Sequence, residues 1–145
     1  MPATINGPTT VLSNGSGGFQ VGSGNNAEVI LGYAAAPQTA TDTATLTAAQ
    51  ITGEMLVVTP TANSSLTLPT GAQIDAAVPS ARVGSTFDLG VVNAAAATYT
   101  VAFVVSGVTG ITNGGNAIIS LAATTSALFR FRKTGDAAWS VYKIG

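Results

Sequence analysis

The chain has 145 residues with only five basic and six acidic side chains, a charged fraction of 8% where a soluble domain has about 25%. Because it contains no histidine and no cysteine, Ser-His-Asp and Cys-His catalysis, disulfides and thiolate metal sites are excluded, and we expect no enzyme activity, no cofactor and no metal. A net charge of −1 argues against nucleic-acid binding, and a net charge this close to zero favours association with other proteins. No apolar run approaches the roughly 18 residues of a membrane helix.

Residues 1–43 differ in composition from the rest of the chain. The first residues have neither the basic nor the apolar part of a signal peptide. Glycine is dense from residue 14 to 26, which costs too much backbone entropy for this stretch to fold alone. We interpret 1–43 as an extended N-terminal arm docked on a partner, with a free tail as the alternative. The apolar residues expected to anchor this arm on a capsid are Ile5, Val11, Leu12, Phe19, Val29, Ile30 and Leu31.

The pattern from residue 44 to 145 predicts one β-sandwich domain. Residues 47–53 form a candidate helical turn, and 72–78 a short helix whose Ile74, Ala77 and Val78 make an apolar stripe. Residues 106–115 are expected to be a loop, and 134–137 a hairpin connection. Strands are expected to start at 45–47 and to span 54–59, 65–68, 85–93, 98–105, 117–121, 126–133 and 139–144. About eight short strands with closely spaced turns are typical of an all-β, jelly-roll-like sandwich, here with one short helix.

Candidate catalytic groups are sparse. The six acidic residues are scattered, so a carboxylate pair for glycoside hydrolysis would have to be assembled by folding. The glycine-rich stretch 15–24 lacks the Gly-Lys-Ser/Thr of a phosphate-binding loop. Tyr99, Trp139 and Tyr142 are candidates for a small sugar platform, although core packing explains such aromatics better.

The sharpest local pattern lies at 128–133. Strand alternation puts Phe129 and Phe131 on one face and Arg130 and Arg132 on the other. The phenylalanines belong in the core, whereas the arginine face meets either solvent or a neighbouring subunit. The last strand, 139–144, has apolar or aromatic residues on both faces and is therefore buried either within its own sandwich or partly against a neighbour. The predicted subunit-interface residues are Arg130, Arg132 and Tyr142.

Several segments of the second part of the chain carry a family resemblance. They are 46–51 (LTAAQI), 66–77 (LTLPTGAQIDAA), 83–89 (VGSTFDL), 92–93 (VN), 129–135 (FRFRKTG) and 139–145 (WSVYKIG). This part resembles the trimeric β-sandwich module of tailed-phage structural proteins, which serves as a capsid decoration (cement) protein or as a module of fibres and spikes. The resemblance implies a homotrimer on the outer capsid surface, with the major capsid protein as its other partner.

We therefore expect a structural virion protein of a bacteriophage that binds the outer capsid surface as a trimer and stabilises the shell after assembly in the host cytoplasm. Neither nucleic acid nor membrane is an expected partner. The alternative is a tail or head fibre module that binds a host surface glycan. A long repetitive shaft would favour the fibre, whereas the chain is short and shows no repeat, which favours the coat component.

Overall fold

The computed structural model describes residues 11–13, 19–21, 35–115 and 120–145, and the chain divides into two units, Met1–Tyr33 and Ala34–Gly145. In the first unit, strands β1 (Val11–Ser13) and β2 (Phe19–Val21) form an antiparallel hairpin. The predicted arm anchors Ile5, Val29, Ile30 and Leu31 lie outside the described residues, as do the side chains of Val11, Leu12 and Phe19.

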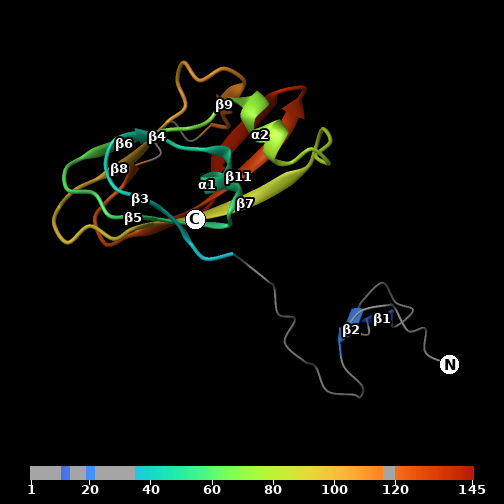
Figure 1. Ribbon diagram of the computed structural model, residues 1–145, viewed down its shortest axis with the longest axis horizontal. Helices are drawn as coiled ribbons and strands as arrows, with labels where there is room; N and C mark the ends of the chain where they lie inside the picture. The colour runs from blue at the N-terminus through green and yellow to red at the C-terminus, as the bar shows by residue number, and fades with distance from the viewer. Residues whose placement is uncertain (1–10, 14–18, 22–34, 116–119) are drawn as a thin grey trace. The chain divides into compact units, whose positions relative to one another are not determined.

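The described residues of the second unit form ten strands and two short helices (Figure 1). A six-stranded sheet has the order β3-β5-β7-β11-β12-β9, and a four-stranded sheet has the order β10-β8-β6-β4. The elements are β3 (Gln38–Ala40), β4 (Ala44–Thr45), α1 (Ala48–Thr52), β5 (Met55–Val58), β6 (Ser64–Thr67), α2 (Gly71–Ala77), β7 (Thr86–Asn93), β8 (Val101–Val104), β9 (Ile111–Asn113), β10 (Ser120–Leu121), β11 (Ser126–Gly135) and β12 (Ala138–Lys143).

The expected mainly-β fold is confirmed, but the jelly-roll topology is not. A jelly roll is built from antiparallel Greek keys. Here β3, β5 and β7 run parallel to one another, as do β4, β6 and β8, while β11 is antiparallel to both β7 and β12. Four short strands were not predicted: β1, β2 and β3 lie within 1–43, which we interpreted as the arm, and β9 lies within the expected loop 106–115.

The parallel pairs arise because the chain alternates between the two sheets from β3 to β8. Each strand of one sheet is followed by a strand of the other, so the next strand in the same sheet returns in the same direction. The returns from the four-stranded to the six-stranded sheet pass through α1, α2 and the 105–110 loop, which therefore lie at one end of the sandwich, the helix end. The connections 41–43, 59–63 and 94–100 lie at the opposite end, the turn end.

Both helices begin with the same pattern, Thr-x-Ala-Gln-Ile, at 47–51 and 70–74. In each, the threonine hydroxyl accepts the N–H of the glutamine, and the glutamine side chain accepts the N–H of the threonine, which is a capping box. Ile51 and Ile74 then turn into the core, fully buried. Four residues of this five-residue pattern are identical at the two sites, and they form a shared helix-start signal rather than the repeat of a long shaft.

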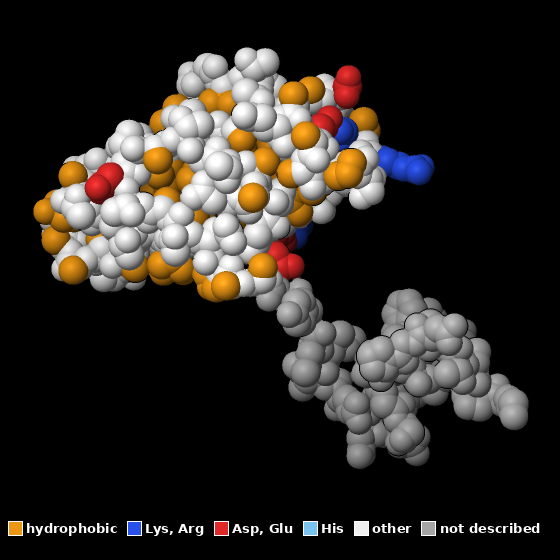
Figure 2. Space-filling model, in the orientation of Figure 1, with side chains coloured by type: hydrophobic (Ala, Val, Ile, Leu, Met, Phe, Trp, Pro, Cys, Tyr) orange, Lys and Arg blue, Asp and Glu red, His pale blue; other side chains and the backbone are white. Residues whose placement is uncertain are grey.

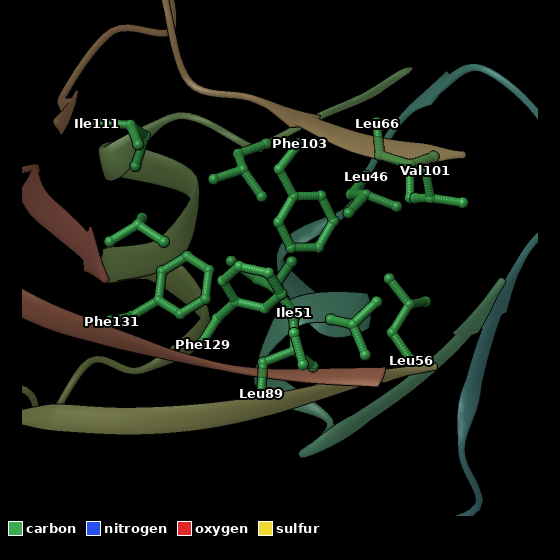
Figure 3. Packing of buried hydrophobic residues seen from close by; sticks show 14 of the residues in the cluster. Leu46, Ile51, Leu56, Leu66, Leu89, Val101, Phe103, Ile111, Phe129 and Phe131 are labelled. Atoms are coloured by element: carbon green, nitrogen blue, oxygen red, sulfur yellow. The ribbon is translucent and has the colours of Figure 1, made fainter. Parts of the chain in front are cut away.

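One hydrophobic core fills the space between the sheets. Charged side chains are few on the surface in view (Figure 2), whereas large apolar side chains from both sheets meet inside (Figure 3). The rings of Phe129 in β11 and Phe103 in β8 lie with centroids 4.9 Å apart, and Phe131 stacks on Phe87 at 4.8 Å. Each fully buried side chain of this size stabilises the fold by about 1.5–3 kcal/mol.

Polar side chains link the connections at the turn end. The Asp42 carboxylate accepts the N–H of Thr61 at 2.8 Å, and the Asn63 side-chain oxygen accepts the N–H of Thr100 at 2.9 Å. Buried Asn93 donates to the carbonyl oxygens of residues 99 and 121, so its polar group is satisfied. These bonds link neighbouring connections of the chain to one another at the turn end.

Candidate interaction surface

The alternation predicted at 128–133 is confirmed in β11. Phe129 and Phe131 are buried, whereas Leu128, Arg130 and Arg132 are exposed on the opposite face. This face, which looks away from the core, is called here the outer face of the six-stranded sheet. Tyr142 of β12 lies opposite Arg130 in the register. The structure thus brings the three predicted interface residues, Arg130, Arg132 and Tyr142, together on the outer face.

Arg130 has a partner within its own chain. Its Nε and Nη2 atoms lie 2.7 Å from the two carboxylate oxygens of Asp88, the residue opposite it in β7. The hydrogen bonds from the guanidinium hold the pKa of Asp88 below its usual value, and those to the carboxylate raise the pKa of Arg130. Because the two charges neutralise each other, this part of the outer face presents an ion pair rather than a free cation.

A row of apolar residues crosses the outer face next to this ion pair. Met55 lies beside Gly90 and Gly90 beside Leu128, and the N–H of Ile144 donates to the Leu128 carbonyl oxygen at 2.9 Å. Met55, Leu128 and Ile144 are 45%, 39% and 48% exposed, which is high for large apolar side chains. We call Met55, Gly90, Leu128 and Ile144 the apolar row. No local sequence pattern indicates this row, because the four residues come together only through the strand register.

Leu128 stands between two hollows of the surface. The first, of about 360 Å³, lies over Gly90, where the missing side chain leaves space; it is lined by Met55, Gly90, Val91, Val92, Ser126, Ala127, Leu128 and Gly145. The second, of about 450 Å³, is lined by Thr52, Glu54, Phe87, Asp88 and Leu128. The surface therefore has an apolar ridge with a depression on each side, a shape that can receive a ridge from another molecule.

A separate polar cluster lies at the helix end. The Asp75 carboxylate in α2 contacts Nζ of Lys133 at 2.5 Å, accepts the indole N–H of Trp139 at 2.8 Å and accepts the backbone N–H of Ala137 at 2.9 Å. The hydrogen bond from Lys133 is the main cause of the lowered pKa of Asp75, and partial burial opposes it. Both carboxylate oxygens are engaged, so this cluster joins α2 to the β11–β12 hairpin.

The expected alternative use of the aromatics as a sugar platform finds no support in the position of Trp139. Its side chain is only 1% exposed and points into the cluster with Asp75, beneath Lys133 at 5.6 Å from the ring centroid. Tyr142 lies on the outer face, whereas Tyr99 lies at the turn end. The three rings therefore do not form one surface, and Trp139 acts as a core residue.

Within residues 35–115 and 120–145, no three His, Cys, Asp or Glu side chains gather where they could hold a metal ion. No helix in the described part of the chain is long and apolar enough to cross a membrane. No protein-family model, no curated protein and no solved structure matches the chain.

Proposed function

We propose that this protein is a structural virion component, a phage capsid decoration protein that binds the outer capsid surface as a homotrimer and stabilises the shell. The observation that carries the proposal is the exposed apolar row beside a neutralised ion pair, in a chain of which only 8% is charged. Exposed apolar patches of this kind mark surfaces that contact other proteins. The resemblance of residues 46–145 to trimeric phage modules supports the same function.

The energetics of such a protein favour many weak contacts. A trimer presents three copies of every contact, and once the first is made the others form at a high effective concentration, so the overall affinity rises steeply. Burying the outer face does not leave an unpaired charge at Arg130, because Asp88 already satisfies it. A charge-poor surface of this type suits permanent contact with a protein shell.

The test is to mix the full chain with purified capsids that lack it. A decoration protein binds saturably at a fixed ratio of copies to capsid subunits and raises the temperature at which the shell opens. Deleting residues 2–31 is expected to abolish capsid binding while a trimer remains in solution. Binding to host cells or to glycan arrays, together with no binding to capsids, would overturn the proposal in favour of a fibre module.

A further inference from the structure

We infer that the outer face of the six-stranded sheet is the surface through which copies of this chain associate, with Leu128 of one copy entering the hollow over Gly90 of the next. The inference rests on the proposed function as a self-associating protein and deepens it by naming the surface and its contacts. We take a second copy of the chain as the occupant because the outer face of one copy complements the outer face of another in shape, in backbone and in charge.

Position 90, in the middle of strand β7, is a glycine. Glycine weakens the interior of a strand, and where it occurs it often permits the close approach of another chain. The packing of its own chain does not require a glycine at position 90. A Cβ there would lie near only the Glu54 carbonyl oxygen, at an ordinary contact distance of 3.6 Å. Its φ angle is also one that other residues adopt readily. The glycine therefore keeps the 360 Å³ hollow open toward the exterior rather than serving the packing of its own chain.

The shape observation is the position of Leu128 beside this hollow. The same surface carries a projecting apolar side chain, 39% exposed, and a depression lined by Met55 and Gly90. In a closed ring of three subunits, each contact joins one patch of a subunit to a different patch of the next subunit. Each copy can thus offer its ridge to one neighbour and its hollow to the other, and every ridge in the ring is buried.

The charge observation concerns the residues that flank the apolar row. Glu54, exposed, directly precedes β5, and Arg132, exposed, lies on β11; by the strand register both stand on the helix-end side of the apolar row. The structure records no salt bridge within its described residues for either of them. Between two copies, Glu54 of one and Arg132 of the next carry opposite charges and attract, while the Asp88–Arg130 pair stays neutral. The face is therefore complementary to itself in charge as well as in shape.

The first test fills or breaks the apolar contact in the full chain. Gly90→Val fills the hollow, Leu128→Asp removes the ridge, and Val83→Asp is the control because Val83 is 66% exposed and lies outside the outer face. Light scattering during a dilution series measures the mass against the chain mass of 14.3 kDa, and circular dichroism with urea unfolding checks the fold. We expect Gly90→Val and Leu128→Asp to raise the dissociation constant at least about tenfold, and Val83→Asp to leave it unchanged.

The second test exchanges the flanking charges. Glu54→Arg and Arg132→Glu are each expected to weaken association, because each places like charges opposite one another, and the double variant is expected to restore it. Unchanged association of Gly90→Val and Leu128→Asp, or an equal loss in Val83→Asp, would overturn the inference. It would also fall if deletion of residues 2–31 alone gave single chains, because the N-terminal segment would then hold the copies together.

These outcomes are separate from those of the proposed function. If every outer-face variant keeps the wild-type mass and the wild-type chain still binds capsids, the inference fails while the decoration function stands. If the outer-face variants become single chains and the wild type assembles but binds no capsid, the self-association surface stands and the decoration function fails.

Discussion

The Asp75 carboxylate and the Lys133 ammonium lie 2.5 Å apart and fasten helix α2 to the end of strand β11. Lys133 follows Phe129 and Phe131 on the inner side of the strand and is only 8% exposed. A lysine in this position is rarely found without a partner. The helix and the last hairpin, which are distant in the sequence, are therefore held together by Asp75 on the helix and Lys133, Ala137 and Trp139 on the hairpin.

Replacing Asp75 by alanine is expected to destabilise the fold. Asp75→Ala removes acceptors for Lys133, Ala137 and Trp139 and leaves a buried ammonium unpaired. Because the Asp75 side chain is 20% exposed, we expect a loss of about 2–3 kcal/mol rather than the full cost of breaking a deeply buried pair. Urea unfolding measures it, with Asp136→Ala, at an exposed turn position, as the control. An equal effect of the two variants would contradict a structural role for the cluster.

Stability is expected to fall at acidic pH mainly through Asp75. Hydrogen bonds from Lys133 and Arg130 hold the pKa values of Asp75 and Asp88 below their usual value, but the exposed Asp88–Arg130 pair is screened by solvent and adds little. A carboxylate with a lowered folded pKa contributes its full stabilisation above the unfolded pKa and loses it as the pH falls through the folded value. The free energy of unfolding should therefore show no loss from these groups down to about pH 5 and should decline below about pH 4. The decline is expected to be smaller in Asp75→Asn, and equal slopes would contradict the assignment.

Gly71 is expected to tolerate no side chain. A Cβ at this position would overlap the carbonyl oxygen of Ala137 and approach that of Gly110, where backbone atoms cannot move aside. Gly71→Ala should therefore cost about 2 kcal/mol or more, since overpacking forces the α2 start away from the hairpin. Gly90→Ala is the matched control, because its Cβ has room. Thermal unfolding compares the two, and similar midpoints would show that the helix end adapts freely.

The Asp88–Arg130 pair is expected to matter for association more than for folding. Its side chains are 36% and 47% exposed, so water and salt screen the attraction and single substitutions should leave urea unfolding nearly unchanged. Asp88→Ala or Arg130→Ala leaves one unpaired charge on the outer face and should weaken association, whereas the double variant should recover most of it. A large loss of fold stability in either single variant would instead make the pair a structural element.

The strands with strong alternation could be predicted from the sequence, and the short paired strands could not. β11 alternates because one face packs on the core, so its start and its two faces follow from local pattern, although the strand runs to Gly135, beyond the expected end at 133. β3 and β9 have three residues each and are defined by partners far along the chain, β5 and β12. Ile74 in α2 is buried and Val78, the C-cap of α2, packs against the core, but Ala77 of the expected stripe is exposed at the last position of the helix.

The candidate site was predictable only in part for the same reason. Alternation placed Arg130 and Arg132 on one face, but pairing of Arg130 with Asp88 depends on the β7–β11 register, which local sequence does not fix. The apolar row has the same dependence, since its four residues come from four segments of the chain. The buried position of Lys133 had a local signal, because Phe129, Phe131 and Lys133 share the period of the strand.

The turn end has a consequence for what the fold can carry. Residues 96–98 are exposed in the connection from β7 to β8, while buried Asn93 and the hydrogen bond from the Thr100 N–H to the Asn63 side-chain oxygen anchor the two sides of that connection. A peptide grafted between those anchors would leave the paired registers and the helix end untouched. If copies associate through the outer face, each copy would then carry its grafted peptide at its own turn end, away from the contact between copies.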